Sequence, residues 1–152
     1  LANRILVMIE KYCDNVIPKT TEVNREIINR AKDIAVEYNE AMELWKFDRA
    51  LEAVWKFISY CDQTISDTQP WAMMKNNKEQ EVNDLLHHLA EGLRHIAVMI
   101  WPIMPETAEK LFVQLGLDVG KELSKPLSEL QSWVELIVGN KISKPEPLFP
   151  RI

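Results

Sequence analysis

Apolar residues recur at steps of three and four along most of this sequence, which is the spacing of one buried face of an α-helix. The clearest run ends at a proline, Pro102, and consists of Val82, Leu85, Leu86, Leu89, Leu93, Ile96 and Ile100. Alternation typical of strands is confined to a short segment near the C-terminus. The pattern therefore predicts an all-α helical bundle of five or six helices with a short extended or β-hairpin tail.

Polar caps and prolines divide this periodicity into separate helices. Thr20 and Thr21 are expected to cap one long helix, and Asp48 is expected to cap the next. The second of these must end near Gln69, because Pro70 disfavours helical geometry in the residue before it. The predicted buried stripes are Val23, Ile27, Ala31, Ile34, Tyr38, Ala41 and Trp45 in the first helix, and Leu51, Val54, Trp55, Ile58, Cys61 and Ile65 in the second.

Shorter helices surround this pair. Ile5, Met8, Ile9 and Tyr12 mark one near the N-terminus, and Pro70 suits the first turn of a short helix from Trp71 to Lys75. Asn76 and Asn77 are expected to start the long apolar helix described above. Pro105 opens the last one, with Gly116 as the residue just beyond its end.

The character of the sequence changes after Leu117. Prolines 126, 145, 147 and 150 crowd the remainder, and the segments 134–138 and 141–143, joined by Gly139-Asn140, are typical of a β-hairpin. We expect residues 1–117 to form the bundle and residues 118–152 to form a tail that packs on it, as one domain. Because Leu1 lies inside a helical pattern and is not Met, the simplest interpretation is a fragment of a longer protein.

The charge balance narrows the function. The chain has 18 Lys and Arg against 23 Asp and Glu, a net charge of −5, whereas a sequence-blind nucleic-acid binder is expected to be basic. The longest apolar stretch is far shorter than the roughly 20 residues that span a bilayer, and no signal peptide is visible. Cys13 and Cys61 form no C-x-x-C pair, so free thiols in a cytoplasmic, reducing compartment are expected.

No catalytic or metal motif is evident. His88, Glu91 and His95 share one helical face and are candidate metal ligands, but no other helix supplies the matching Glu-x-x-His element. Histidines at the surface or core edge are the favoured interpretation, His87 included. Phosphate-binding and nucleophile motifs are absent, since the chain has only four glycines.

Two residues stand out from their surroundings. Trp45, Trp55 and Trp101 are expected in the core and Trp133 between tail and bundle, whereas Trp71 follows the polar corner 67–70. An exposed aromatic ring beside a rigid proline suits base stacking, and packing at the corner is the alternative. Arg4 interrupts an apolar face, with Lys11 farther along the same side; a solvated basic edge is its alternative interpretation.

Several motifs resemble one family, the C-terminal anticodon-binding domain of bacterial methionyl-tRNA synthetases. The resemblance runs in order from residue 1 to 152. Its motifs are Leu1-x-x-Arg4, Tyr38-Asn39-Glu40-Ala41-Met42, Ala50-Leu51-Glu52-Ala53-Val54-Trp55, Pro70-Trp71-x-x-x-Lys75, Trp101-Pro102-x-Met104-Pro105-Glu106-Thr107-Ala108, and Leu148-Phe149-Pro150-Arg151-Ile152.

The resemblance implies recognition of the CAU anticodon of methionine tRNA. Trp71 would stack on an unpaired base, Arg4 would hydrogen-bond the anticodon cytosine, and Lys75 and Lys11 are weaker candidates. The family helix usually begins one residue earlier with an Asn; Asn3 is not expected to replace it, because it lies on a different helical face from Arg4.

The family's catalytic signatures, His-Ile-Gly-His and Lys-Met-Ser-Lys-Ser, and its zinc-binding cysteines are absent. The chain alone should therefore be inert and need no cofactor, whereas the parent enzyme would use ATP and possibly zinc. Expected partners are methionine tRNA and the catalytic domain of the same protein, with no DNA and no membrane. The open alternatives are the equivalent domain of a leucyl, isoleucyl, valyl or cysteinyl enzyme, or a bundle that binds protein.

Overall fold

A computed structural model describes residues 1–133 and 139–150 of the chain. These residues form an all-α bundle, as the periodicity predicts. In chain order the helices are α1 (Ala2–Tyr12), α2 (Arg25–Glu43), α3 (Phe47–Thr68), α4 (Pro70–Lys75), α5 (Glu79–Ile100), α6 (Pro105–Gln114), α7 (Val119–Leu123) and α8 (Leu127–Leu130).

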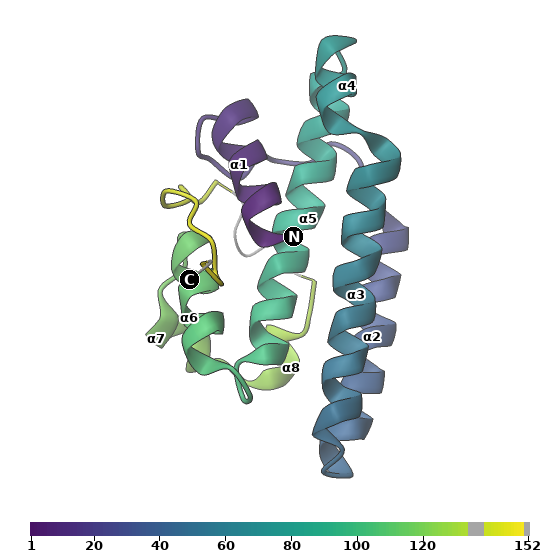
Figure 1. Ribbon diagram of the computed structural model, residues 1–152, viewed down its shortest axis with the longest axis vertical. Coiled ribbons are helices and arrows are strands. Elements are labelled where there is room, and N and C mark those ends of the chain that lie inside the picture. Colours follow the sequence, from purple (N-terminus) through teal and green to yellow (C-terminus); the bar gives the residue numbers. More distant parts are fainter. Residues whose placement is uncertain (134–138, 151–152) are drawn as a thin grey trace.

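Helices α2 and α3 form a long antiparallel hairpin that runs along one side of the molecule (Figure 1). Helix α5 lies beside the hairpin and contacts α1, α2, α3, α4 and α6. The short α4 stands at one end of the long axis, and the turn between α2 and α3 lies at the other (Figure 1). No helix among the described residues is long and apolar enough to cross a membrane.

Helix α5 is the centre of the core. All seven residues of its predicted stripe, from Val82 to Ile100, are buried. Every residue from Leu85 to Ile100 is buried, because other elements surround this part of the helix on all sides. This complete burial explains why His87, His88 and His95 lie inside the protein and not at the surface or core edge, where their polar character predicts them.

The start of α2 differs from the prediction. Its capping residue is Asn24, whose side chain accepts hydrogen bonds from the backbone N–H groups of Glu26 and Ile27. Thr20 and Thr21 instead contact the Asp84 carboxylate on α5: the Thr21 backbone N–H donates at 2.7 Å, and the Thr20 hydroxyl lies at 3.1 Å. The two threonines therefore attach the loop before α2 to the central helix.

The starts of α3 and α5 also differ by one to three residues from the expected positions. Helix α3 begins at Phe47, and Asp48 lies in its first turn without capping it through its side chain. Helix α5 begins at Glu79 rather than at Asn76 or Asn77. Asn77 has a φ of +57°, in the left-handed region, so it belongs to the turn between α4 and α5.

Two tryptophans expected in the core are exposed. Trp45 is 80% exposed and Trp55 is 51% exposed, while Val23 lies outside the buried stripe at 63%. Helix α3 buries three of its six predicted stripe residues, Val54, Cys61 and Ile65, together with Ala50, Ala53 and Phe57. The alanines at this face allow α3 to pack closely on α2 and α5.

Trp45 is exposed because α2 ends before it. The backbone N–H groups of Trp45 and Lys46 donate to the carbonyls of Met42 and Ala41, which is the hydrogen-bond pattern of a Schellman motif. Trp45 occupies the left-handed position of that motif with a φ of +57°, where glycine is the common residue. Its ring packs edge-to-face on Phe47 at 6.0 Å.

The tail contains the short helices α7 and α8, which the periodicity did not indicate. Gly116 has a φ of +74° just beyond α6, as predicted. The first strand of the predicted hairpin, 134–138, lies outside the described residues. Lys141, in the second predicted strand, forms an antiparallel bridge with Val16, and the Ile17 N–H donates to the Asn140 carbonyl at 2.9 Å.

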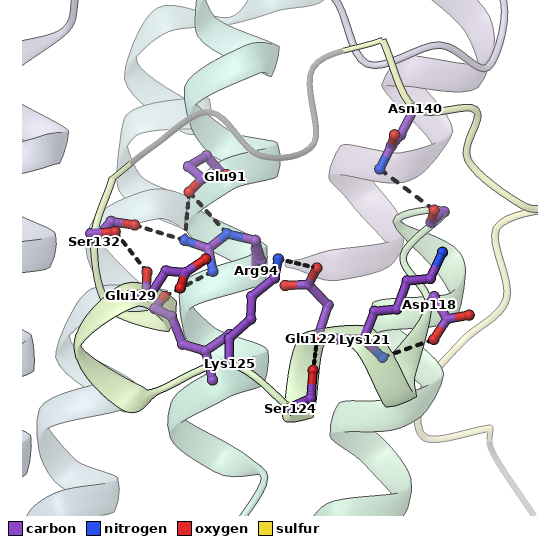
Figure 2. Close-up of polar contacts among 12 residues, drawn as sticks. Glu91, Arg94, Asp118, Lys121, Glu122, Ser124, Lys125, Glu129, Ser132 and Asn140 are labelled. Carbon is purple, nitrogen blue, oxygen red and sulfur yellow. Dashed lines mark hydrogen bonds and ion pairs between the residues drawn. The ribbon is translucent and has the colours of Figure 1, made fainter.

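A buried arginine joins the tail to α5 (Figure 2). Arg94 is fully buried and donates to the carbonyl oxygens of Leu130 at 2.8 Å and Ser132 at 2.9 Å. It also donates to the Glu91 carboxylate through Nε at 2.9 Å and Nη2 at 2.7 Å. One guanidinium thus neutralises a buried carboxylate and satisfies two backbone carbonyls of the tail.

Aromatic and amide contacts reinforce this junction. Trp133 stacks on His95 with ring centroids 5.0 Å apart, and on His88 at 6.2 Å, so it packs the tail on the bundle as expected. Asn39 on α2 and Gln131 exchange two amide hydrogen bonds of 2.8 and 2.9 Å. Residues 130–133 are therefore fixed to both α2 and α5.

Candidate nucleic-acid interface

Three helices converge where α3 gives way to α4. Gln69 ends α3 with a φ of +48°, and Pro70 is the first residue of α4. This break turns the chain within one residue, so Trp71 lies in the first turn of α4 instead of continuing α3. Pro70 is buried, while Trp71 is 41% exposed. The corner is therefore rigid, and it presents a partly accessible aromatic ring.

Arg4 reaches this ring from the first turn of α1. Its Cζ lies 5.7 Å from the centroid of the Trp71 ring, within the range of a cation–π contact. Its Nη1 also lies 3.5 Å from Oδ1 of Asp62 on α3. The side chains of Arg4 and Asp62 are 40% and 41% exposed, so both remain accessible to a ligand.

A surface pocket of about 500 Å³ adjoins these residues. Its walls are the Trp71 ring and the Arg4 side chain, and the rest of its lining is mostly apolar: Leu1, Asn3, Val7 and Met8. A flat aromatic face beside a fork of N–H donors can stack on a nucleobase and hydrogen-bond its edge at the same time. The arrangement suits a single unpaired base.

The structure brings together two of the four residues predicted for the site. Arg4 and Trp71 line the same pocket, whereas Lys11 and Lys75 do not. Lys11 Nζ lies instead over the ring of its neighbour Tyr12, 5.3 Å from the centroid. Lys75 is in the last turn of α4, where its charge favours the helix C-terminus.

Asn3 and Asp62 were not predicted for this site. Asn3 is adjacent to Arg4 in sequence and was excluded because its helical direction differs, yet it lines the pocket because the first turn of α1 borders it broadly. Asp62 lies 58 residues from Arg4, and no local pattern marks it. The only available signal was that an arginine on an apolar face needs an acidic partner.

The cysteine thiols are poor nucleophiles. Burial, aided by the Asp62 carboxylate, raises the pKa of the Cys61 thiol to about 12. Burial, with the nearby charges of Glu79 and Asp14, raises the pKa of Cys13 to about 11. Both cysteines are free, and both thiols remain protonated at neutral pH.

The polar cluster on α5 has a structural explanation. Burial lowers the pKa of His95, whose Nε2 lies 3.0 Å from Arg94 Nη2 and 3.5 Å from Glu91 Oε1. Burial alone would raise the pKa of Glu91, but hydrogen bonds from His95 and Arg94 and the guanidinium charge hold it below its usual range. Among the described residues, no group of three or more His, Cys, Asp or Glu side chains is arranged to hold a metal ion.

Comparison with known proteins identifies the fold. Residues 24–143 match the family described as the anticodon-binding domain of tRNA ligase. The whole chain is 35% identical to a methionine–tRNA ligase of Caldanaerobacter subterraneus and 36% identical to that of Bacillus subtilis. It covers 24% and 23% of those proteins, and so spans about a quarter of the relatives' length.

A solved structure agrees. Methionyl-tRNA synthetase of Mycobacterium tuberculosis in its free state superposes on 99% of this chain with a TM-score of 0.88 at 25% identity, and the match covers 31% of that protein. The chain belongs to the family of anticodon-binding domains of tRNA ligases. Within that family, it corresponds in sequence and fold to the anticodon-binding domain of methionyl-tRNA synthetase.

Proposed function

We propose that this chain reads the CAU anticodon of a methionine tRNA, with Trp71 and Arg4 as the reading residues. The observation that carries the proposal is their convergence: a partly exposed aromatic residue and a guanidinium from two separate helices border one surface pocket. The remainder of the methionine–tRNA ligase polypeptide, in the cytoplasm, would supply the ATP-dependent ligation. ATP and any zinc would bind in that catalytic part.

The chemistry of cytosine supports the role of Arg4. Cytosine carries two hydrogen-bond acceptors, O2 and N3, side by side on one edge, and an arginine fork donates to such a pair. Uracil carries an N–H donor at N3, where cytosine has an acceptor, so it cannot accept the second hydrogen bond of the arginine fork. An arginine beside a stacking ring therefore favours cytosine over uracil at this position.

The acidic net charge of the chain favours recognition of specific bases over sequence-independent binding to the RNA backbone. With a net charge of −5, the domain lacks the basic surface that drives sequence-independent binding. We expect the isolated chain to bind an anticodon hairpin with a Kd weaker than micromolar at physiological salt. Other parts of the ligase would supply most of the affinity for tRNA.

The test is binding of RNA hairpins with a CAU or a UAU loop to the chain and its variants. Loss of one stacked base corresponds to ~1–3 kcal/mol, or about 5- to 150-fold in Kd, so Trp71→Ala should weaken CAU binding by that factor. Trp71→Phe should retain part of the affinity, because it keeps an aromatic face. Trp55→Ala is the matched control, since Trp55 is also about half exposed but lies outside the pocket.

Arg4→Ala should reduce the preference for CAU over UAU, and Arg4→Lys should restore little of it, because a lysine cannot make the paired contact. Unchanged CAU binding in both Trp71→Ala and Arg4→Ala would show that the assigned site is wrong. Equal affinity of the unmodified chain for both loops would favour one of the two alternatives: the equivalent domain of a leucyl, isoleucyl, valyl or cysteinyl enzyme, or a helical bundle that binds protein.

A further inference from the structure

We infer that Asp62 is a positioning residue for anticodon reading: it holds the Arg4 guanidinium beside Trp71 before RNA arrives. This inference rests on the proposed function of Arg4. Its structural basis is the ion pair between Arg4 Nη1 and Asp62 Oδ1, at 3.5 Å, in the same region as the 5.7 Å contact between Arg4 and the Trp71 ring.

The pair joins separate elements of the fold. Asp62 is on α3, Arg4 on α1 and Trp71 on α4, so the carboxylate and the ring restrain the guanidinium from two helices. Asp67, one and a half turns farther along α3, behaves differently. Its carboxylate accepts a hydrogen bond of 2.6 Å from Gln63 on its own helix. Asp62 is thus the acidic residue of this region that contacts the candidate reading residue.

An exposed arginine without such a partner samples many rotamers, and fixing it on a ligand reduces affinity. A guanidinium has five N–H donors, so an ion pair through Nη1 leaves others for a base. Asp62 therefore lowers the cost of fixing Arg4 when cytosine binds. Uracil gains less from this arrangement, because its edge does not accept two hydrogen bonds from the guanidinium.

The same carboxylate also repels RNA phosphates. That repulsion acts on every sequence alike, so it changes overall affinity but not the preference between loops. The two effects of Asp62 are therefore separable. Overall affinity reports its charge, and the ratio of the UAU and CAU dissociation constants reports its positioning of Arg4.

The experiment measures this ratio with CAU and UAU hairpins for the full 152-residue chain and its variants at low salt. Asp62→Asn should lower the ratio by about two- to tenfold, the factor expected when one rotamer-rich side chain must be immobilised on binding. Asp67→Asn removes the same charge from the same helix and should leave the ratio unchanged. Asp62→Glu keeps a carboxylate and should retain most of the preference.

A second arm tests whether Asp62 acts through Arg4. In an Arg4→Ala background, Asp62→Asn should have no further effect on the ratio. If Arg4→Ala abolishes the preference while Asp62→Asn leaves it as high as Asp67→Asn does, the positioning role is wrong and the proposed function stands. If Arg4→Ala itself leaves the preference intact, the proposed site fails and this inference fails with it. Helical circular dichroism of each variant excludes unfolding as the cause.

Discussion

Arg94→Leu is the substitution with the largest expected effect on the free energy of unfolding. Arg94 and Glu91 are both fully buried, and the arginine supplies the positive charge next to the carboxylate. Without it, Glu91 must stay charged in the interior or take up a proton. Protonation at pH 7 of a group with an ordinary pKa of 4.5 costs about 3.4 kcal/mol, at 1.36 kcal/mol per pH unit.

The carbonyls of Leu130 and Ser132 lose their donor in the same variant, which adds about 1 kcal/mol for each hydrogen bond. The total at pH 7 is about 5 kcal/mol, at the upper end of the range measured when a buried ion pair loses one partner. For a chain of this length, that corresponds to a fall in Tm of about 10–20 °C, taking 2–4 °C per kcal/mol.

The penalty should depend on pH in a definite direction. In the variant, the pKa of Glu91 is higher in the folded than in the unfolded chain, so stability falls as the pH rises above about 4.5. In the unmodified chain that pKa is lowered on folding, so the stabilisation by Glu91 is present at neutral pH and lost as the pH falls through the folded value. The difference between the two proteins should therefore shrink by about 2.7 kcal/mol from pH 7 to pH 5.

Urea unfolding at pH 7 and pH 5 measures both quantities. The double variant Arg94→Leu, Glu91→Gln removes the carboxylate that lost its partner and should recover about 3 kcal/mol at pH 7. Lys78→Gln is the matched control, because Lys78 pairs with Glu81 at the same i,i+3 spacing but both side chains are more than half exposed; it should cost less than about 1 kcal/mol. The reasoning would be refuted if Arg94→Leu alone lost under 1 kcal/mol of unfolding free energy, or if its loss did not depend on pH.

Two further predictions concern the turn after α2 and the thiols. Trp45→Gly should be more stable than Trp45→Ala by about 1 kcal/mol in thermal or urea unfolding, because alanine retains the unfavourable left-handed backbone at a φ of +57° and glycine relieves it; equal stability of the two variants would contradict the strain. Cys61, whose thiol pKa is raised to about 12, should react with a thiol reagent at pH 8 only as fast as the protein unfolds, with the partly accessible Cys13 reacting earlier. Rapid modification of both thiols in the folded protein would show that burial does not protect Cys61.

The apolar spacing predicted the buried face correctly for the central helix α5 and only in part for α3. Every stripe residue of α5 is buried, because a helix in the middle of a bundle has no exposed side for its apolar residues to occupy. For α3, the pattern contained both Ala50-Ala53 and Leu51-Trp55 as possible buried faces. The prediction was right for Val54, Cys61 and Ile65. Trp55 is exposed, and Leu51 and Ile58 are only partly buried, because the buried face is rotated toward Ala50, Ala53 and Phe57.

The candidate site was predicted only in part, for a related reason. Trp71 was identified by its polar, proline-bounded corner and by resemblance, and Arg4 by its position on an apolar face. Asp62 and Asn3 join them only through tertiary packing. Arg94 was likewise invisible to sequence reasoning, since its acceptors include backbone carbonyls 36 and 38 residues away, and backbone atoms leave no signature in residue types.

The contacts made by residues 130–133 also have a consequence for the order of folding. They bridge separations of 36 to 92 residues along the chain, so they close large loops and depend on α2 and α5 being already side by side. During synthesis from the N-terminus, α5 emerges before Leu130 and Ser132, and Arg94 and Glu91 remain in contact with water until those carbonyls arrive. The dry interior around α5 is therefore completed only after residues 130–133 have been synthesised and have packed on it.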